Sequence, residues 1–534
     1  MEFSTGTFVL IAGWGAALLI LWNLHRFAKA FSASFFWKTA AGLTLAAVFL
    51  GIILFFRQQR LAAVSPRVVI FPLVEKFSGR ARVTPLGLAF ADQLTLALQL
   101  RAPDFRPLPT ASIFAFAHPD SLVDADYAAR FAQGLDLPWA GWGEYHRTGA
   151  LLHVQLRLLD PARRTPVLQS SFTLVDSTKI GEAAAVFTEK LVAHFELKEK
   201  KSFSHPSVST LSAAQQSAYY SAYLNLLQRR YGPAAAETAA LVQQDSTQPL
   251  FLTLATTGRM QQLRQQRADE TEWQNALAVL LPKLHAAVKR DSLYAPAFIL
   301  LGECYLQARK WNEAENMLRR GYALDPFLAR FYVDLAQLHR SRFARDGFKN
   351  ELELYQHALA LNPLEVDAVL GAVEYLLRDN RRNQALALLE KYHRLNPHHL
   401  AVLTALARIH IEKGELAQAL PLFETILRLD PHNVEAFYNL GIAYFHQNDL
   451  DHAARFFTRA QQIAGYPDAH MYLAQIYERR GDTTAAIPHL RERIRLSNGD
   501  NDVYAAAARK HLYGLLLRRG EIPKHLLPDT IMTK

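Results

Sequence analysis

The chain has 534 residues, 50% of them hydrophobic and 20% charged, so it is long enough for several domains and too apolar to be largely disordered. Its formal net charge is +10, and half of that excess lies in residues 1–67, where six basic residues accompany one acidic residue. Basic residues beside apolar segments are typical of membrane flanks. We therefore expect a lipid bilayer, and no nucleic acid, as the partner of this charge.

Two apolar segments stand at the start of the chain. Thr7–Leu24 and Thr39–Phe56 each run for 18 residues without a charge, which is near the lower limit for a membrane-spanning helix. A signal peptide is the alternative for the first segment, but the basic start and small-residue cleavage site of such a peptide are missing. We expect residues 1–66 to form a two-helix transmembrane anchor.

The orientation of this anchor follows from its basic residues. Three basic residues and no acid lie between positions 26 and 38, which favours a cytoplasmic loop with both ends of the hairpin outside. Arg57, Arg60 and Arg67 flank the other side equally, so the reverse orientation stays open. We expect the remainder of the chain to lie outside the cytoplasm.

Residues 67–200 alternate between predicted strands and predicted helices. Strands are predicted at Arg67–Leu73, up to Tyr145, through Leu159 after a turn at Arg147–Ala150, and at Pro166–Val175. Helices are predicted at Pro85–Leu100, Tyr127–Leu135 and Lys179–Leu197. Such an alternation indicates a small α/β domain.

The sequence of this segment resembles the TolB-type amino-terminal module of bacterial envelope proteins. The similar phrases are "VVIFPL", "GLAFADQLTLAL" and "FAQGLDLPWAGWGEYHRTGALLHVQLRLLDPARRTPV". The phrase "VEKFSGRARVTP" departs from the family pattern, which puts any ligand contact there in doubt. The resemblance implies a non-catalytic module outside the cytoplasm, and hence a multi-pass protein of the bacterial inner membrane with periplasmic C-terminal domains.

A polar linker, Lys198–Thr210, leads to a repetitive region. The phrases "ALNP", "RLNP" and "RLDP" place Pro363, Pro397 and Pro431 34 residues apart, and "ALDP" ends 37 residues earlier at Pro326. The unit from Val434 carries Phe, Leu-Gly and Tyr in its first half and Ala, Phe and Ala in its second. This pattern resembles the tetratricopeptide repeat, in which two helices pack closely at small residues.

The repeat pattern divides the rest of the chain. Residues 201–294 hold the linker and two degenerate units, Ser212–Asp245 and Leu250–Asp291, the second with a polar loop at Gln261–Glu272. Residues 295–498 hold six units that begin near Phe298, Tyr332, Val369, Leu403, Phe437 and His470. Residues 499–534 form a capping helix, Val503–Arg519, and a tail. The predicted fold is therefore multi-domain: a transmembrane helical hairpin, a small α/β domain and an all-α superhelix (α-solenoid).

Motifs for chemistry are missing from this sequence. It contains no phosphate-binding GxxxxGK[ST], no GxGxxG and no HExxH. The histidines near His393–His410 have no carboxylate or cysteine at ligand spacing, and the single cysteine, Cys304, takes a packing position in a repeat helix. We therefore expect neither an enzyme nor a metal or other cofactor.

The concave surface of the repeats is the predicted binding site for a protein or peptide. In the tetratricopeptide pattern, fixed positions of each first helix face this surface, and here they hold Leu370, Glu374, Arg378, Thr404, Arg408, Ile411, Tyr438, Ile442, Phe445, Gln475 and Arg479. Tyr438, Ile442 and Phe445 form an apolar patch. Arg408 and Arg479 flank this patch, and such a surface suits a bound peptide. The alternative is that neighbouring repeats bury the same side chains.

Together these features predict a non-catalytic, membrane-anchored scaffold that holds a partner protein and supports the assembly or stabilisation of an envelope or membrane complex. The alternative is an extracytoplasmic sensing component whose output domain is on another chain. Only six residues precede the first apolar segment, which is too few for an output domain of its own.

Overall fold

The computed structural model describes residues 67–521, apart from residues 78–79, 102–105, 118, 176–178, 198–209, 267, 465 and 498–501. The two expected spans, Thr7–Leu24 and Thr39–Phe56, thus lie outside the described residues. Within the described part of the chain, no helix is long and apolar enough to cross a bilayer. The chain divides into two compact units, with the boundary between Glu365 and Val366.

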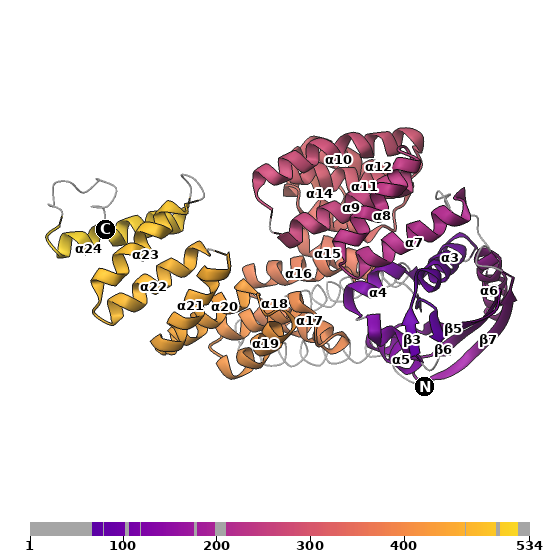
Figure 1. The fold of residues 1–534 in the computed structure, drawn as a ribbon, viewed down its shortest axis with the longest axis horizontal. Helices are drawn as coiled ribbons and strands as arrows, with labels where there is room; N and C mark the ends of the chain where they lie inside the picture. Colours follow the sequence, from indigo (N-terminus) through magenta and orange to yellow (C-terminus); the bar gives the residue numbers. More distant parts are fainter. Residues whose placement is uncertain are drawn as a thin grey trace, which may run out of the picture. The chain divides into compact units, whose positions relative to one another are not determined.

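A mixed sheet forms the start of the first unit (Figure 1). Its strands are β1 (Val68–Ile70), β2 (Val74–Phe77), β3 (Arg80–Val83), β4 (Pro107–Leu108), β5 (Trp139–Thr148), β6 (Leu151–Asp160) and β7 (Thr165–Leu174). Strand β1 lies parallel to both β4 and β5, and β5, β6 and β7 pair antiparallel in chain order. All three residues of β1 are buried, as an apolar run in the middle of a sheet requires. The small α/β region expected from the sequence is confirmed.

Two strands within the stretch "VEKFSGRARVTP" pair with each other as a hairpin, which the sequence did not predict. Strand β2 pairs antiparallel with β3 and parallel with the end of β5, so the hairpin extends one edge of the sheet. Outside Val74, its side chains are exposed or half-buried, and four of its eight strand residues are charged. An edge hairpin of this kind carries no apolar run by which a strand could be recognised.

Helices cover both faces of the sheet. Helices α3 (Pro85–Arg101) and α6 (Ile180–His194) pack on one face over a shared apolar core that includes Leu94 and Phe187. Helix α5 (Ala125–Gly134) contacts the other face, where Phe131 meets Phe71 edge-on with ring centroids 5.7 Å apart. Two short helices, α4 (Thr110–Phe116) and η1 (Pro119–Val123), complete the region.

Helix α3 approaches the segment after β1 so closely that only glycine fits at position 87. A Cβ atom on Gly87 would lie 1.9 Å from the carbonyl oxygen of Leu73, and the Leu73 amide donates a 3.1 Å hydrogen bond to the Gly87 carbonyl. The helix therefore begins in direct backbone contact with the sheet layer.

Helix pairs make up the remainder of the first unit. They are α7 (Ala213–Leu227) with α8 (Tyr231–Gln244), α9 (Pro249–Gln266) with α10 (Glu270–Arg290), and α11 (Ala295–Gln307) with α12 (Trp311–Leu324). The polar loop expected at Gln261–Glu272 is wrong, because α9 continues to Gln266 and an Asp269–Glu272 capping box starts α10 immediately afterwards. The Tyr220 hydroxyl donates a 2.9 Å hydrogen bond to Asp92, which joins α7 to α3.

The last part of the first unit is irregular. Helix α13 (Ala329–Ala336) is only eight residues long, and the short α14 (Arg340–Ala344) separates it from α15 (Glu351–Leu361). This stretch contains the 37-residue spacing between Pro326 and Pro363, so the extra residues are accommodated around α14. The loop after α15 also contacts the α/β region, because the Asn362 amide donates a 2.9 Å hydrogen bond to Ser112.

The second unit is a regular stack of helix pairs (Figure 1). Its helices are α16 (Val366–Arg378), α17 (Arg382–Leu395), α18 (Leu400–Glu412), α19 (Leu416–Leu429), α20 (Val434–His446), α21 (Leu450–Ala464), α22 (Pro467–Arg479), α23 (Thr483–Arg495) and α24 (Val503–Arg518). Ala385, Ala419, Ala453 and Ala486 are fully buried at equivalent positions of the second helices. Close helix contact at small residues, as the repeat pattern predicted, is thus observed.

The turns of the second unit also follow the sequence. Asn380, Gly414, Asn448 and Gly481 end the first helices and all have positive φ, between 57° and 80°. Asparagine and glycine tolerate this conformation better than other residues, so they stop a helix at little cost.

Candidate partner-binding surface

The eleven residues predicted to bind a partner lie on the first helices of four consecutive pairs in the second unit. Helix α16 carries Leu370, Glu374 and Arg378, α18 carries Thr404, Arg408 and Ile411, α20 carries Tyr438, Ile442 and Phe445, and α22 carries Gln475 and Arg479. We call this set the first-helix face. Four of its members, Glu374, Arg378, Arg408 and Arg479, are exposed, and the others are half-buried or buried.

Phe445 is buried, so the alternative given for the predicted apolar patch applies to this residue, whereas Tyr438 and Ile442 are half-buried. Phe445 is only 5% exposed, because Tyr472 packs edge-on at 5.4 Å and the Arg479 guanidinium lies 4.1 Å from its ring centroid. A cation–π contact of this kind contributes on the order of 0.5–1 kcal/mol at a partly exposed site. Phe445 and Arg479 therefore stabilise the contact between α20 and α22.

Tyr438 packs in the same aromatic cluster, whose other rings are Phe445, Phe457, Tyr466 and Tyr472, but its side chain stays partly exposed to solvent. Its ring packs 4.7 Å from Tyr466, 5.7 Å from Phe457 and 5.8 Å from Tyr472, and the residue is half-buried. Burial, together with the neighbouring tyrosine and aspartate groups, raises the pKa of Tyr438 well above its usual range. The Tyr438 hydroxyl is neutral in the physiological range, and it shares a hydrogen bond with Tyr472.

Three polar side chains of the first-helix face have no partner among the described residues. Arg408, Glu374 and Gln475 make no hydrogen bond or ion pair with any described residue, although their neighbours on the same helices do. An exposed charge that is not paired within its own chain loses less when it binds a partner, because no internal ion pair must first be broken.

Sequence comparisons identify the repeats of the second unit. Tetratricopeptide repeat models match residues 376–420, 404–467 and 469–504. Residues 376–504 carry tetratricopeptide repeats. Proteins of this type are typically non-catalytic scaffolds that bind proteins or peptides. No curated protein shows significant sequence similarity to the chain.

Solved structures with a related arrangement of helices share little sequence with the chain. The Cut9–Hcn1 assembly of APC/C is 18% identical over 64% of this chain and 63% of that chain, with a TM-score of 0.44. PilF of Pseudomonas aeruginosa is 22% identical over 41% of this chain and 99% of its own, with a TM-score of 0.33. YrrB, described as a tetratricopeptide repeat protein with an unusual peptide-binding site, is 18% identical over 36% of this chain and 97% of its own, with a TM-score of 0.28. These likenesses concern the stacking of helices alone.

Two of the histidines near His393–His410 make hydrogen bonds within the repeats. His399 caps α18 by accepting from the Val402 amide, and His410 bonds to Glu415 at 2.8 Å. Cys304 is a free, fully buried thiol 3.6 Å from the sulfur of Met260, and burial raises its pKa to about 12. No group of three or more metal-ligating side chains occurs among the residues that the structure describes.

The sequence analysis missed Tyr472 and Tyr466 as members of the aromatic cluster. Tyr472 stacks on Phe457 with ring centroids 4.7 Å apart and an interplanar angle of 8°, and it also covers Phe445. Tyr472 lies three residues before Gln475, at a helix position that the repeat pattern does not assign to the concave surface. Its aromatic character was the available signal, since large aromatics fill the gap between tetratricopeptide helix pairs.

A separate cavity lies in the first unit, where the α/β region meets α7. It has a volume of about 550 Å³ and is lined by Glu75, Arg82 and Arg147 of the sheet, Gln93 of α3, and Gln216, Ser217 and Tyr220 of α7. Arg82 makes hydrogen bonds of 2.9 and 2.8 Å to Glu75, whereas Arg147 approaches the same carboxylate only to 3.9 Å. Two guanidiniums thus share one carboxylate, which leaves one positive charge at the cavity.

Proposed function

We propose that the chain is a non-catalytic, membrane-anchored scaffold that holds a partner protein on the first-helix face of its tetratricopeptide repeats. The observation that carries this proposal is that three helices of the first-helix face carry polar side chains, Glu374, Arg408 and Gln475, with no hydrogen bond or ion pair to any described residue. The half-buried Tyr438 belongs to the same face. Charged groups arranged around an aromatic contact provide both orientation and affinity for a polypeptide.

The setting of this scaffold is part of the proposal. The two apolar segments in residues 1–66 would hold the chain in a bacterial inner membrane, and the resemblance to the TolB-type module supports a periplasmic position for the described domains. A partner held close to the bilayer meets other membrane components at a raised local concentration. Such tethering suits the assembly or stabilisation of an envelope or membrane complex.

Affinity purification of the full chain in mild detergent tests the scaffold, and recovery of a stoichiometric membrane protein is the expected result. Replacing Arg408→Glu should then weaken binding of that protein about tenfold or more, because an unpaired cation becomes an anion on the first-helix face. Binding is measured by titrating the purified partner against the immobilised chain.

Arg455→Glu is the matched control, because Arg455 on the second helix α21 is exposed and has no ion-pair partner in the part of the chain that the structure describes. This variant should bind as the wild type does. Equal losses in both variants would point to net charge alone as the cause, and unchanged binding in Arg408→Glu would remove the first-helix face as the site.

A sensing role is the second candidate, and the cavity between the sheet and α7 favours it. Its volume of about 550 Å³ is within the usual range for small-molecule sites, and its net positive lining suits an anionic ligand. A ligand there would contact both the α/β region and the first repeat helix. If the chain is a sensor, an anionic metabolite should stabilise its folded state through Arg147. A scaffold would need no small molecule.

A further inference from the structure

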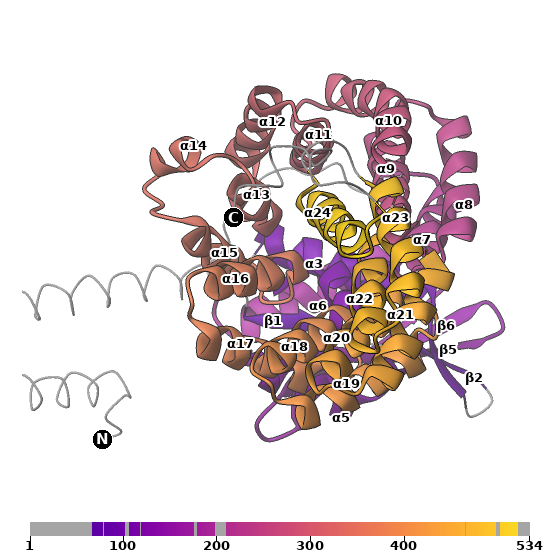
Figure 2. The same ribbon diagram turned by 90° about the vertical axis from the view of Figure 1, so that its left-hand side faces the viewer.

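A second cavity lies on the outside of the first helix pairs, between α8 and α10. It has a volume of about 660 Å³, and α9 forms its floor. The three helices lie side by side in Figure 2. Its walls include Ala235, Ala239 and Val242 of α8 and Val279 of α10. We call this cavity the α8–α10 groove.

The groove is open and apolar. Val279 is 55% exposed on one wall, and Ala235 and Ala239 are exposed on the other. A pocket for a lipid chain or a drug-sized molecule usually covers most of its ligand. Walls that leave apolar side chains in water instead suit a partner that brings its own apolar surface to cover them.

Gly258 lies on the floor of the groove, where the packing of the chain leaves room for a larger side chain. A Cβ atom on Gly258 would meet only Leu226, at an ordinary contact distance of 3.6 Å. On Gly302 and Gly441 it would lie 2.5 and 2.7 Å from Leu318 and Phe457, so internal packing requires those two glycines. Packing within the chain does not require Gly258, although glycine weakens the interior of an 18-residue helix. The close approach of another backbone would explain it.

Polar groups of the groove are also left without partners. Thr256 is fully buried beneath the floor, and its hydroxyl makes no hydrogen bond with any described residue, although a helical threonine can usually bond to its own helix. On the rim, Arg259 bonds only to Gln262, and Lys283 has no partner among the described side chains. The acid of the lining, Glu272, already accepts a hydrogen bond from the Asp269 amide in the capping box. Two bases, Arg259 and Lys283, against this one acid leave the lining with a net positive charge.

We propose that the α8–α10 groove binds an amphipathic α-helix of a partner protein, with the apolar face of that helix on the floor and acidic residues opposite Arg259 and Lys283. Helices enter grooves of this kind through apolar residues spaced three and four positions apart. The small floor residues allow the incoming backbone to approach closely, and the two cations select its charge. This site is in the first unit and is independent of the first-helix face, so either proposal can fail without the other.

A phage-displayed library of helix-forming peptides provides the test. It is selected on the detergent-purified full chain, after depletion on the variant Gly258→Leu, whose side chain fills the floor. Enriched peptides should carry apolar residues at i, i+3 or i+4 and i+7 and a negative net charge. Synthetic copies should bind at least tenfold more weakly to Gly258→Leu and several-fold more weakly to Lys283→Glu.

Gly258→Ala is the matched control, because its methyl group fits at 3.6 Å from Leu226, and it should bind peptides as the wild type does. Circular dichroism establishes whether Gly258→Leu folds, and Val279→Glu on the exposed wall replaces it if it does not. Enrichment of basic or non-helical peptides, or equal binding to the filled variant, would overturn the proposal. So would a spin-labelled stearate that binds the wild type and not Gly258→Leu while no peptide does, since the groove would then be an acyl-chain site.

Discussion

At the scale of single residues, two histidines, one buried and one half-buried, join the last two helices of the final repeat. Nδ1 of His470 on α22 lies 3.0 Å from Nδ1 of His489 on α23, and His470 is 3% exposed. Burial lowers the pKa of His470, and Arg493 and Arg495 lower it further while Glu492 raises it. Burial and the neighbouring His470 lower the pKa of His489. The remaining charges near the pair, Asp468 and Asp502, are bound to Arg493.

The stability of the second unit should therefore fall in mild acid. Both pKa values are lower in the folded state than in the unfolded chain, where histidine titrates near 6.5, so the unfolded state binds more protons as the pH falls below that value. The melting temperature should be constant above about pH 7.5 and should decline towards pH 5.5. The double variant His470→Gln/His489→Gln should show a shallower decline, and His432→Gln, at an exposed histidine, should not. An equal slope in all three proteins would exclude the pair as the cause.

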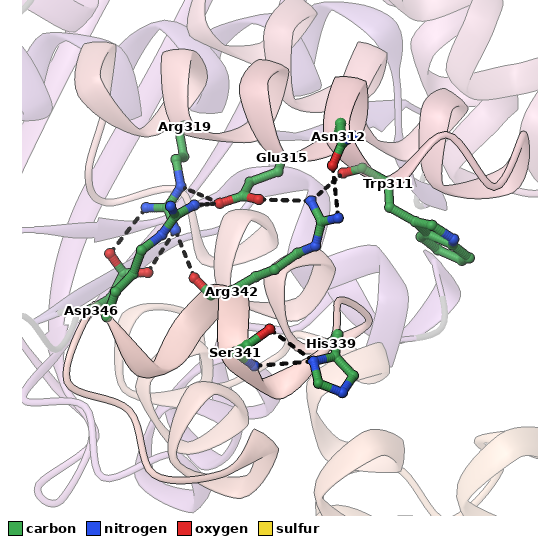
Figure 3. A network of polar contacts seen from close by, with 9 residues as sticks. Trp311, Asn312, Glu315, Arg319, His339, Ser341, Arg342 and Asp346 are labelled. Carbon is green, nitrogen blue, oxygen red and sulfur yellow. Dashed lines mark hydrogen bonds and ion pairs between the residues drawn. The ribbon is translucent and has the colours of Figure 1, made fainter.

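At the scale of elements, a network of arginines holds the irregular part of the first unit together (Figure 3). Glu315 of α12 accepts hydrogen bonds of 2.8 Å from Arg319 and Arg342 and pairs with Arg345. Arg319 also binds Asp346 through two hydrogen bonds of 3.0 and 2.9 Å. Helix α14 has only five residues and cannot persist on its own hydrogen bonds, so these contacts fix it against α12.

Replacing Glu315→Gln should destabilise the first unit by about 3 kcal/mol, because three guanidiniums would then surround a neutral group. Chemical denaturation followed by circular dichroism measures this change. Glu313→Gln removes an exposed acid from the same helix and should cost less than about 1 kcal/mol. If the two variants were equally stable, α14 would be held by apolar packing rather than by the network.

Some helices and strands could be predicted from the sequence, and others could not. The prolines and small residues predicted the helix pairs of the second unit, because each pair repeats the same local packing problem. The hairpin β2–β3 and the helix α14 could not be predicted, since distant partners rather than local patterns stabilise them. The same limit applied to Phe445: its helix position indicated which face it lies on, but only the fold shows that Tyr472 and Arg479 cover it.

At the scale of the whole molecule, the proposed anchor determines on which side of the membrane both units work. Alkaline phosphatase fused after Lys534 should be active, because the enzyme folds only outside the cytoplasm and the proposed hairpin returns the chain to that side. The same enzyme inserted between the two apolar segments, after Ser32, should be inactive. Activity of the second fusion and inactivity of the first would reverse the orientation. A chain that remains in the aqueous fraction without detergent would remove the anchor altogether.

Because Cys304 is buried, its reaction with a thiol reagent can report when the helices around it separate. Its sulfur lies in the apolar cluster shared by α9, α10 and α11, and it is the only thiol in 534 residues. A thiol reagent can reach it only when these helices separate. The rate of modification therefore measures local unfolding of the first unit alone. Ligands and helices that bind the first unit would lower the rate of Cys304 modification. Those that bind only the second unit would leave this rate unchanged.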